Sequence, residues 1–140
     1  MIQLSVFRSG QAATITTVSL RGCALDSAHL ALLLPTLSQC VALTHLDLSD
    51  NNLTAEGVEA LVSALLQPGS RLRDLRLANN WLGPAGVCAL VGPLVANTGL
   101  QYLDLSNTSA RPADALRLDS DQRALQALTD ALQVSLLLIF

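Results

Sequence analysis

The side chains with the clearest catalytic potential in this sequence are a histidine, an aspartate and two serines, the residue types of a hydrolase triad. They are His45, Asp74 and either Ser19 or Ser49. A triad also needs an oriented, sheltered histidine base and an oxyanion hole. The pattern described below places these side chains on an open sheet face, which offers neither. We therefore expect no catalytic residues and no enzymatic activity.

The cysteines are the residues that could bind a metal or form disulfides. Cys23, Cys40 and Cys88 are widely spaced and include no C-x-x-C pair, so we expect no metal site and no cofactor. Reduced thiols in the cytoplasm are favoured over a disulfide, the weaker alternative. The N-terminus lacks a signal-like apolar run, and the C-terminal VSLLLIF is far shorter than the about 20 residues that cross a bilayer. These features predict a cytoplasmic chain with no membrane partner.

Composition narrows the choice of partners further. Apolar residues make up 51% and charged residues only 14%, against about a quarter charged in a typical domain, so a large aliphatic core is expected. The net charge is −3 and the chain contains no Lys. A nucleic-acid surface needs clustered basic side chains that displace counterions. We therefore expect no nucleic-acid partner.

The apolar residues follow an internal repeat, which is the strongest signal in the sequence. The template L-x-x-L-x-L-x-x-N/C-x-L fits four segments, which begin at Ile15, Leu43, Leu72 and Leu100. The intervals between these starting positions differ by no more than a single residue. The alternation in the template predicts one short strand in each repeat.

A second apolar pattern follows the strand in the first three repeats. Its spacing of three and four residues is typical of an amphipathic helix. The aligned sets are Leu30, Leu33 and Leu37; Val58, Leu61 and Leu65; and Val87, Leu90 and Leu94. Suitable N-cap residues precede them at Asp26, Thr54 and Gly83, and Pro84 suits the first helical position. Each repeat is therefore predicted to be a strand, a turn and a helix.

The dimensions of these elements predict a curved stack. Adjacent strands lie about 4.8 Å apart, whereas a helix with its side chains is about 10 Å across. One repeat cannot bury its apolar faces alone, so neighbours stack. We expect an α/β solenoid, a horseshoe arc with parallel strands on the concave face and helices on the convex face.

One polar position of the template has a structural explanation. It is filled by Cys23, Asn51, Asn80 and Thr108. A buried Asn can donate twice and accept twice, and so satisfies backbone groups that the turn leaves without partners. We expect these residues to form a structural ladder, which Cys23 and Thr108 complete less fully.

The segment from LDLSDNN to GPAGVCAL resembles the leucine-rich repeats of ribonuclease inhibitor and of NOD-like receptors. The shared features are the repeat length, which alternates by a single residue, the helix in every repeat and the P-G-S-x-L-x-x-L-x-L junction from Pro68 to Leu77. The resemblance covers roughly Ile15 to Leu105 and implies a leucine-rich repeat fold. It implies a role as inhibitor, sensor or scaffold, or membership of a branch of GTPase activators, and it carries over no catalytic residue.

The repeats divide the chain into one predicted domain, 1–140. Residues 1–14 are expected to form an N-terminal cap or edge strand, because Ile2, Leu4 and Val6 alternate. The repeats span 15–42, 43–71, 72–99 and an irregular 100–133, and an apolar tail follows at 134–140. We interpret the chain as a fragment or short isoform of a longer repeat protein that could self-associate through its terminal edges.

The residues between the leucines of each strand are the candidate binding residues, because side chains alternate across a strand. Three rows are expected to face the concave side: Thr17, His45, Asp74 and Tyr102; Ser19, Asp47, Arg76 and Asp104; and Arg21, Ser49, Ala78 and Ser106. Tyr, Trp and Arg dominate the energetics of protein interfaces. The predicted partner-binding set is His45, Asp47, Asp74, Arg76, Trp81, Tyr102 and Asp104.

Two of these residues have competing explanations. Arg76 either binds a partner or forms a cross-strand ion-pair ladder with Asp47 and Asp104. Trp81 aligns with the small or polar Ala24 and Asn52, which indicates an exposed rim; it either anchors a partner or folds over its own repeat. The function predicted is a non-catalytic scaffold, inhibitor or sensor module that binds a protein on the concave face. The alternative is a repeat-type GTPase-activating protein.

Overall fold

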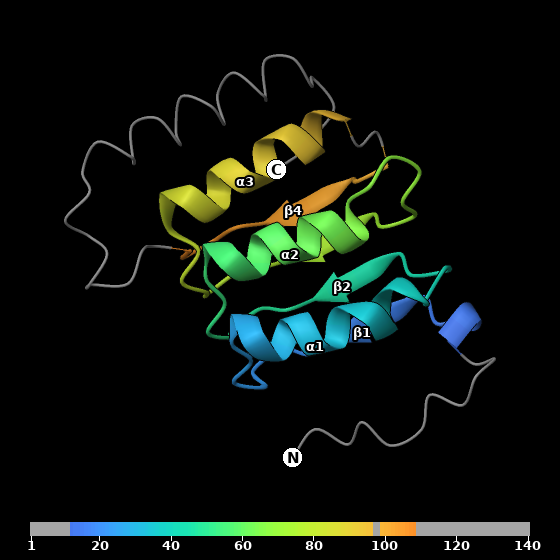
Figure 1. The fold of residues 1–140 in the computed structure, drawn as a ribbon, viewed down its shortest axis with the longest axis horizontal. Coiled ribbons are helices and arrows are strands. Elements are labelled where there is room, and N and C mark those ends of the chain that lie inside the picture. The colour runs from blue at the N-terminus through green and yellow to red at the C-terminus, as the bar shows by residue number, and fades with distance from the viewer. Residues whose placement is uncertain (1–11, 97–98, 109–140) are drawn as a thin grey trace.

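The computed structural model describes residues 12–96 and 99–108, which form a two-layer stack of short strands and helices (Figure 1). The N-terminal cap apart from residues 12–14, the irregular part of the fourth repeat and the tail 134–140 lie outside this description. Residues Ala12–Thr14 form η1, a single 3-10 turn, so the expected N-terminal edge strand does not extend into them.

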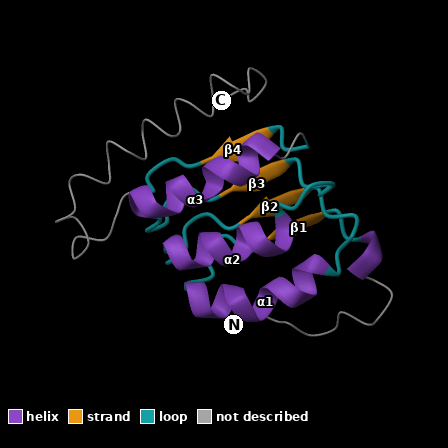
Figure 2. Ribbon diagram, turned by 45° about the horizontal axis from the view of Figure 1, so that its top comes forward, coloured by secondary structure: helices purple, strands orange, loops and turns teal. Residues whose placement is uncertain are grey.

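Four strands and three helices alternate along the described part of the chain. The strands are β1 (Thr17–Ser19), β2 (His45–Asp47), β3 (Asp74–Arg76) and β4 (Tyr102–Asp104). The helices are α1 (Ser27–Ser38), α2 (Ala55–Leu65) and α3 (Gly83–Ala96). The sheet is parallel with the strand order β1-β2-β3-β4. Figure 2 shows the three helices side by side along one face of this sheet, and none of them covers the other face.

The predicted repeat register is the register of the sheet. Val18 pairs with Leu46, Leu46 with Leu75 and Leu75 with Leu103. Each strand is short because the chain turns soon after it, toward the helix of the same repeat. The expected α/β solenoid, with strands on the concave side and helices on the convex side, is therefore the fold of the described residues.

The core fills the space between sheet and helices with leucine. Leu46 and Leu75 at the centres of β2 and β3 are 1% and 0% exposed. Val18 in β1 and Leu103 in β4 are only half-buried, because the described sheet gives each outer strand a neighbour on one side. Among the predicted helix residues, Val87 is also half-buried.

The helix N-termini partly match the expected caps. Asp26 caps α1, since its Oδ1 accepts the backbone N–H of His29 at 2.8 Å. Thr54 occupies the N-cap of α2 but makes no side-chain capping bond; its hydroxyl lies 2.8 Å from the hydroxyl of Ser27 on the neighbouring repeat. Gly83 begins α3 with a φ of +57°, a conformation that glycine adopts without strain.

The helices approach most closely where glycines face the preceding repeat. A Cβ at Gly57 would lie 2.8 Å from the Ser27 hydroxyl, and one at Gly86 would lie 3.3 Å from the Cα of Ala55. The two glycines occupy the same position in consecutive repeats. They permit the close packing of successive helices.

The three cysteines of the chain, which are all among the described residues, are free thiols. The disulfide alternative is therefore wrong. In residues 12–96 and 99–108, no helix has the length and apolar character needed to cross a bilayer.

Candidate functional site

The open face of the sheet carries the predicted rows in register. Thr17, His45, Asp74 and Tyr102 lie side by side across the four strands, and so do Ser19, Asp47, Arg76 and Asp104. The third row differs from the expectation, because Ser49 and Ala78 are 4% and 8% exposed. The strands end before these residues, so alternation no longer directs their small side chains to solvent.

A bidentate ion pair joins Arg76 to Asp74 on this face. Nε of Arg76 donates to Oδ1 of Asp74 at 3.1 Å, and Nη2 donates to Oδ2 at 3.0 Å. This two-point geometry is the strongest form of an Arg–carboxylate pair. The Asp74 side chain is only 17% exposed, whereas that of Arg76 is 47% exposed. The hydrogen bonds from Arg76 to Asp74 raise the pKa of Arg76 above its usual value.

This pairing corrects the expected cross-strand ladder. Arg76 bonds to Asp74, two residues earlier on the same face of β3, and not to Asp47 or Asp104 on the neighbouring strands. Residues two apart on one strand lie on the same side of the sheet, so a short bond within the strand is available. Asp47 and Asp104 act on Arg76 only as nearby charges.

Tyr102 completes a cluster with Arg76 on the adjacent strand. The centre of the Arg76 guanidinium lies 5.2 Å from the centroid of the Tyr102 ring, which is within the range of a cation–π contact. Tyr102 is 41% exposed. We name Asp74, Arg76 and Tyr102 the concave patch.

Asp47 and Asp104 have a local role at the ends of their strands. Oδ1 of Asp47 accepts the backbone N–H of Ser49 at 2.9 Å, and Oδ1 of Asp104 accepts that of Ser106 at 2.9 Å. The hydroxyl and backbone bonds from Ser106 lower the pKa of Asp104. These carboxylates close the turn after the strand, while their charge still flanks Arg76.

The residues of the possible triad bond to other groups. Nδ1 of His45 lies 2.8 Å from the hydroxyl of Thr44, which itself donates to the backbone oxygen of Thr16 at 3.0 Å. Nδ1 of His45 therefore carries the proton in that contact. The carboxylate that would orient the histidine belongs to Asp74, which binds Arg76 instead. His45 and Asp74 are therefore not paired as a triad requires.

The buried asparagines link the repeats behind the strands. Oδ1 of Asn51 accepts the backbone N–H of Leu25 at 2.9 Å, and Oδ1 of Asn80 accepts that of Leu53 at 3.0 Å. Nδ2 of each donates to backbone oxygens in its own and the preceding repeat, among them Leu20 for Asn51 and Leu48 for Asn80. Both side chains are buried at 4% and 2% exposure.

The outer members of this ladder make fewer bonds. Sγ of Cys23 lies 3.6 Å from the backbone oxygen of Arg21, and the Thr108 hydroxyl donates to the oxygen of Leu105 at 2.8 Å. Both contacts stay within one repeat. A thiol or hydroxyl has fewer bonding sites than a carboxamide, which accounts for the difference.

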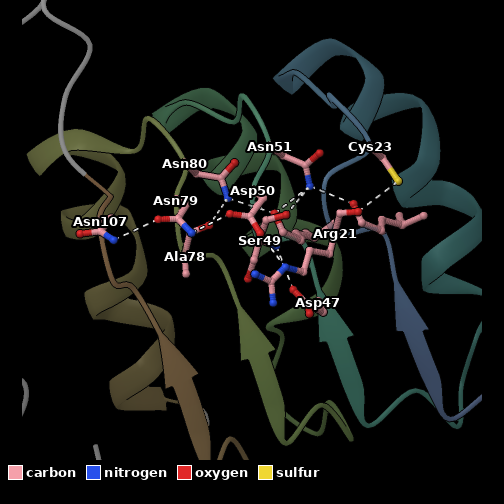
Figure 3. Close-up of polar contacts among 12 residues, drawn as sticks. Arg21, Cys23, Asp47, Ser49, Asp50, Asn51, Ala78, Asn79, Asn80 and Asn107 are labelled. Carbon is pink, nitrogen blue, oxygen red and sulfur yellow. Dashed lines mark hydrogen bonds and ion pairs between the residues drawn. The ribbon is translucent and has the colours of Figure 1, made fainter.

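A second polar line, on the exposed side of the Asn ladder, was not predicted (Figure 3). The Arg21 guanidinium pairs with Asp50, Asn79 donates to Asp50 at 2.6 Å, and Asn107 donates to Asn79 at 3.0 Å. We name these four residues the rim strip. The bonds from Asn79 and Arg21 lower the pKa of Asp50.

The backbone explains why the last three members of this strip are Asp or Asn. Gly22, Asp50, Asn79 and Asn107 occupy the same repeat position and have φ values of +64°, +57°, +54° and +52°. Gly, Asn and Asp are the residues that tolerate this left-handed region. The sequence does contain a signal for this strip: a Gly, Asp or Asn stands immediately before each ladder residue. The repeat template allows any residue at that position.

Trp81 lies with the rim strip and apart from the concave patch. It is 38% exposed and lines a shallow hollow with Asp50, Asn51, Asn52, Asn79, Asn80 and Asn107. The structure thus separates the predicted binding residues into two groups. Arg76, Asp74 and Tyr102 form one, with His45, Asp47 and Asp104 around them, and Trp81 belongs to the other.

Known proteins share both the sequence pattern and the fold. A family model described as "Leucine Rich repeat" matches residues 39–62. Ribonuclease inhibitor of Sus scrofa is 37% identical over 70% of this chain and 22% of its own length. NLR family member X1 of Rattus norvegicus is 38% identical over 74% of this chain and 10% of its own length.

The chain is a leucine-rich repeat protein.

The leucine-rich repeats of this chain thus span 22% or less of the length of these relatives. A solved structure of leiomodin-1 actin-binding site 2 has the same fold, with a TM-score of 0.63 at 21% identity over 87% of this chain and 64% of that one. This likeness concerns the fold alone. The residues of the concave patch lie outside the repeat template, so membership of the leucine-rich repeat class does not determine them.

Proposed function

We propose that this leucine-rich repeat chain is a non-catalytic protein-binding module whose concave patch contacts the partner. The observation that carries the proposal is the arrangement of Arg76, which Asp74 holds at two points beside the exposed ring of Tyr102. Neither Arg76 nor Tyr102 occupies a leucine or asparagine position of the repeat. The scaffold therefore does not require them.

The physical properties of the patch suit protein recognition. Arg76 offers a planar set of donors and Tyr102 offers a large contact area with few torsions to freeze. The bonds to Asp74 and the ring contact already fix the guanidinium, so less conformational entropy is lost on binding. A fixed aromatic–guanidinium pair on an open sheet is a suitable anchor.

The charges around the patch favour a basic partner surface. Asp47, Asp74 and Asp104 face one Arg76 across three neighbouring strands, which leaves an excess of negative charge. Complementary charge raises the rate of association more than the affinity. We expect association to slow as ionic strength rises, since the screening length falls to about 10 Å at 0.1 M salt.

The relatives support a binding role of this kind. One of them is by name an inhibitor of a ribonuclease, and a protein inhibitor acts by contact with another protein. The free cysteines are compatible with a cytoplasmic location, which we include in the proposal.

Site-specific photo-crosslinking tests the proposal in cell extract. The chain has no Lys, so a photoreactive benzoylphenylalanine side chain replaces amine-reactive reagents. It is introduced at position 102 on the concave patch. The matched control carries it at position 59, on the outer surface of α2. We expect a crosslinked product from position 102 that excess unmodified chain displaces and that Arg76→Ala in the same chain removes. A product from position 59 alone would place the partner on the convex side.

A further inference from the structure

We propose that the rim holds a second binding site, formed by Trp81 and the carboxamides of Asn52, Asn79 and Asn107, for an uncharged proline-rich peptide segment. This rim site goes beyond the concave patch and does not depend on it. The four residues line the same shallow hollow together with Asp50.

The fold does not account for Trp81. The aligned residues in the first two repeats are Ala24 and Asn52, so the position tolerates small side chains. The structural contact of Trp81 is made by its backbone N–H, which donates to the oxygen of Leu53 at 2.8 Å. In residues 12–96 and 99–108 no hydrogen bond engages the indole N–H, and the residue is 38% exposed.

The rim offers N–H donors that the fold leaves unused. Asn79 uses one N–H on Asp50, and Asn107 uses one on Asn79; each carboxamide has a second N–H. The Asn52 side chain is exposed and makes no hydrogen bond within the described part of the chain. The charge of Asp50 is balanced by Arg21. The site therefore carries no net charge and has free N–H donors, which suits an uncharged ligand with free carbonyl oxygens.

A polyproline II segment has these properties. It makes no internal hydrogen bonds, so its carbonyl oxygens are open to donors, and proline supplies no backbone N–H of its own. Its rings pack against aromatic side chains in known peptide-binding grooves. The indole face of Trp81 can receive a proline ring while the neighbouring carboxamides bind the peptide oxygens.

The spacing of the repeats matches the pitch of such a segment. Residues three apart in a polyproline II helix lie on one face about 9.3 Å apart, and two steps between strands amount to about 9.6 Å. Groups on one face of the peptide therefore recur at the distance that separates every second repeat. At Asn107 such a group meets an N–H donor, whereas the Asp50 carboxylate is an acceptor that stays paired with Arg21 and Asn79. The bonds of the rim strip hold these positions before binding, which lowers the entropic cost.

Tryptophan fluorescence of the full chain tests the rim site, because Trp81 is its single tryptophan. The probe is hexaproline with blocked ends. Its length-matched control is an alternating Gly-Ser hexapeptide, and maltotriose tests for a saccharide ligand. We expect a saturable fluorescence change with hexaproline, at dissociation constants of about 1 mM or tighter, and none with the other two.

Substitutions then locate the peptide, with calorimetry as the readout because Trp81→Ala removes the fluorophore. Trp81→Ala should weaken hexaproline binding by about tenfold or more and Asn52→Ala by several-fold, whereas Tyr102→Ala on the concave patch should leave it unchanged. Circular dichroism verifies that each variant is folded.

Three results would overturn the rim site. They are the absence of saturation with hexaproline up to about 10 mM, an equal response to the Gly-Ser peptide or to maltotriose, and a loss of binding in Tyr102→Ala but not in Trp81→Ala. None of these results bears on the concave patch, whose test uses crosslinking from position 102.

Discussion

At the scale of single residues, the tightest constraint is the left-handed turn that follows each strand. Its φ is positive at Gly22, Asp50, Asn79 and Asn107, and the side chains of the last three also bond to a neighbouring repeat. Each Asp or Asn at this position thus both tolerates the positive φ and supplies a side-chain hydrogen bond to a neighbouring repeat. These two roles can be separated by substitution.

Substitution of Asn79 separates backbone strain from side-chain bonding. Asn79→Ala should reduce the free energy of unfolding by about 1–2 kcal/mol, because alanine is strained at this φ. Asn79→Gly loses the same exposed side-chain bonds but is unstrained, so it should cost less than about 1 kcal/mol. Urea denaturation of both variants is the measurement. Equal costs for Ala and Gly would show that backbone conformation is not what selects asparagine here.

The lowered pKa values of Asp26, Asp50 and Asp104 predict a loss of stability in acid. Each carboxylate is stabilised in the folded state by hydrogen bonds, so the folded state binds fewer protons than the unfolded one below about pH 4. The stabilisation is complete above the unfolded pKa and is lost as pH falls through the folded pKa. Thermal melts from about pH 7 to about pH 2.5 should show this decrease.

Asp50→Asn provides the control for this effect, because it retains the shape of the side chain and removes its titration. We expect its melting temperature to fall less steeply between about pH 4 and about pH 2.5 than that of the parent chain. Parallel curves would exclude Asp50 as a contributor.

At the scale of elements, the spacing of the helices depends on small residues at their N-terminal turns. Gly86 in α3 faces Ala55, the first residue of α2, and the Cα of Ala55 lies 3.3 Å from the place that a Cβ on Gly86 would take. The backbone of α2 cannot give way without moving the repeat. This contact links helix packing to the parallel strand pairing beneath it.

Alanine substitution at two glycines of α3 tests this dependence. Gly86→Ala overpacks the contact with Leu82 and Ala55, and should cost about 1–3 kcal/mol. Gly92→Ala meets no atom within 4 Å and replaces a glycine inside α3, so it should raise stability by up to about 1 kcal/mol. Chemical denaturation compares the two. A Gly86→Ala variant as stable as Gly92→Ala would contradict the close approach of α2 and α3.

At the scale of the whole molecule, the repeat period predicted the fold because one template fixes strand, turn and helix together. The register from Val18 to Leu103 follows directly from the nearly constant step between repeats. The site was harder to predict. Whether Arg76 bonds along its strand or across it depends on side-chain torsions, and Ser49 is buried because β2 ends earlier than the template suggests.

The rim strip shows a different limit of sequence reasoning. The template allows any residue at the position of Asp50, Asn79 and Asn107, so the template alone assigns these residues no role. Their positive φ values explain why the position is filled by Asp or Asn. The sequence predicts that Trp81 lies on an exposed rim, but only the fold brings it beside these side chains.

Removal of a central core side chain should destabilise the whole stack. Leu77 is 0% exposed, and Leu77→Ala should cost about 2–5 kcal/mol of a total that is about 5–15 kcal/mol for a typical domain. Leu32→Ala on α1 is the matched control, since Leu32 is 79% exposed. Thermal unfolding followed by circular dichroism compares them. A Leu77→Ala curve that overlays that of Leu32→Ala would contradict the packing of the repeats.

The central claim, that the concave patch binds a protein, is tested most directly by calorimetric titration of the partner identified by crosslinking. Arg76→Ala and Tyr102→Ala should each weaken binding by about 1–3 kcal/mol while circular dichroism shows an intact fold, and Glu59→Ala on the exposed surface of α2 should change it little. Weaker binding in Glu59→Ala with unchanged binding in Arg76→Ala and Tyr102→Ala would contradict the claim.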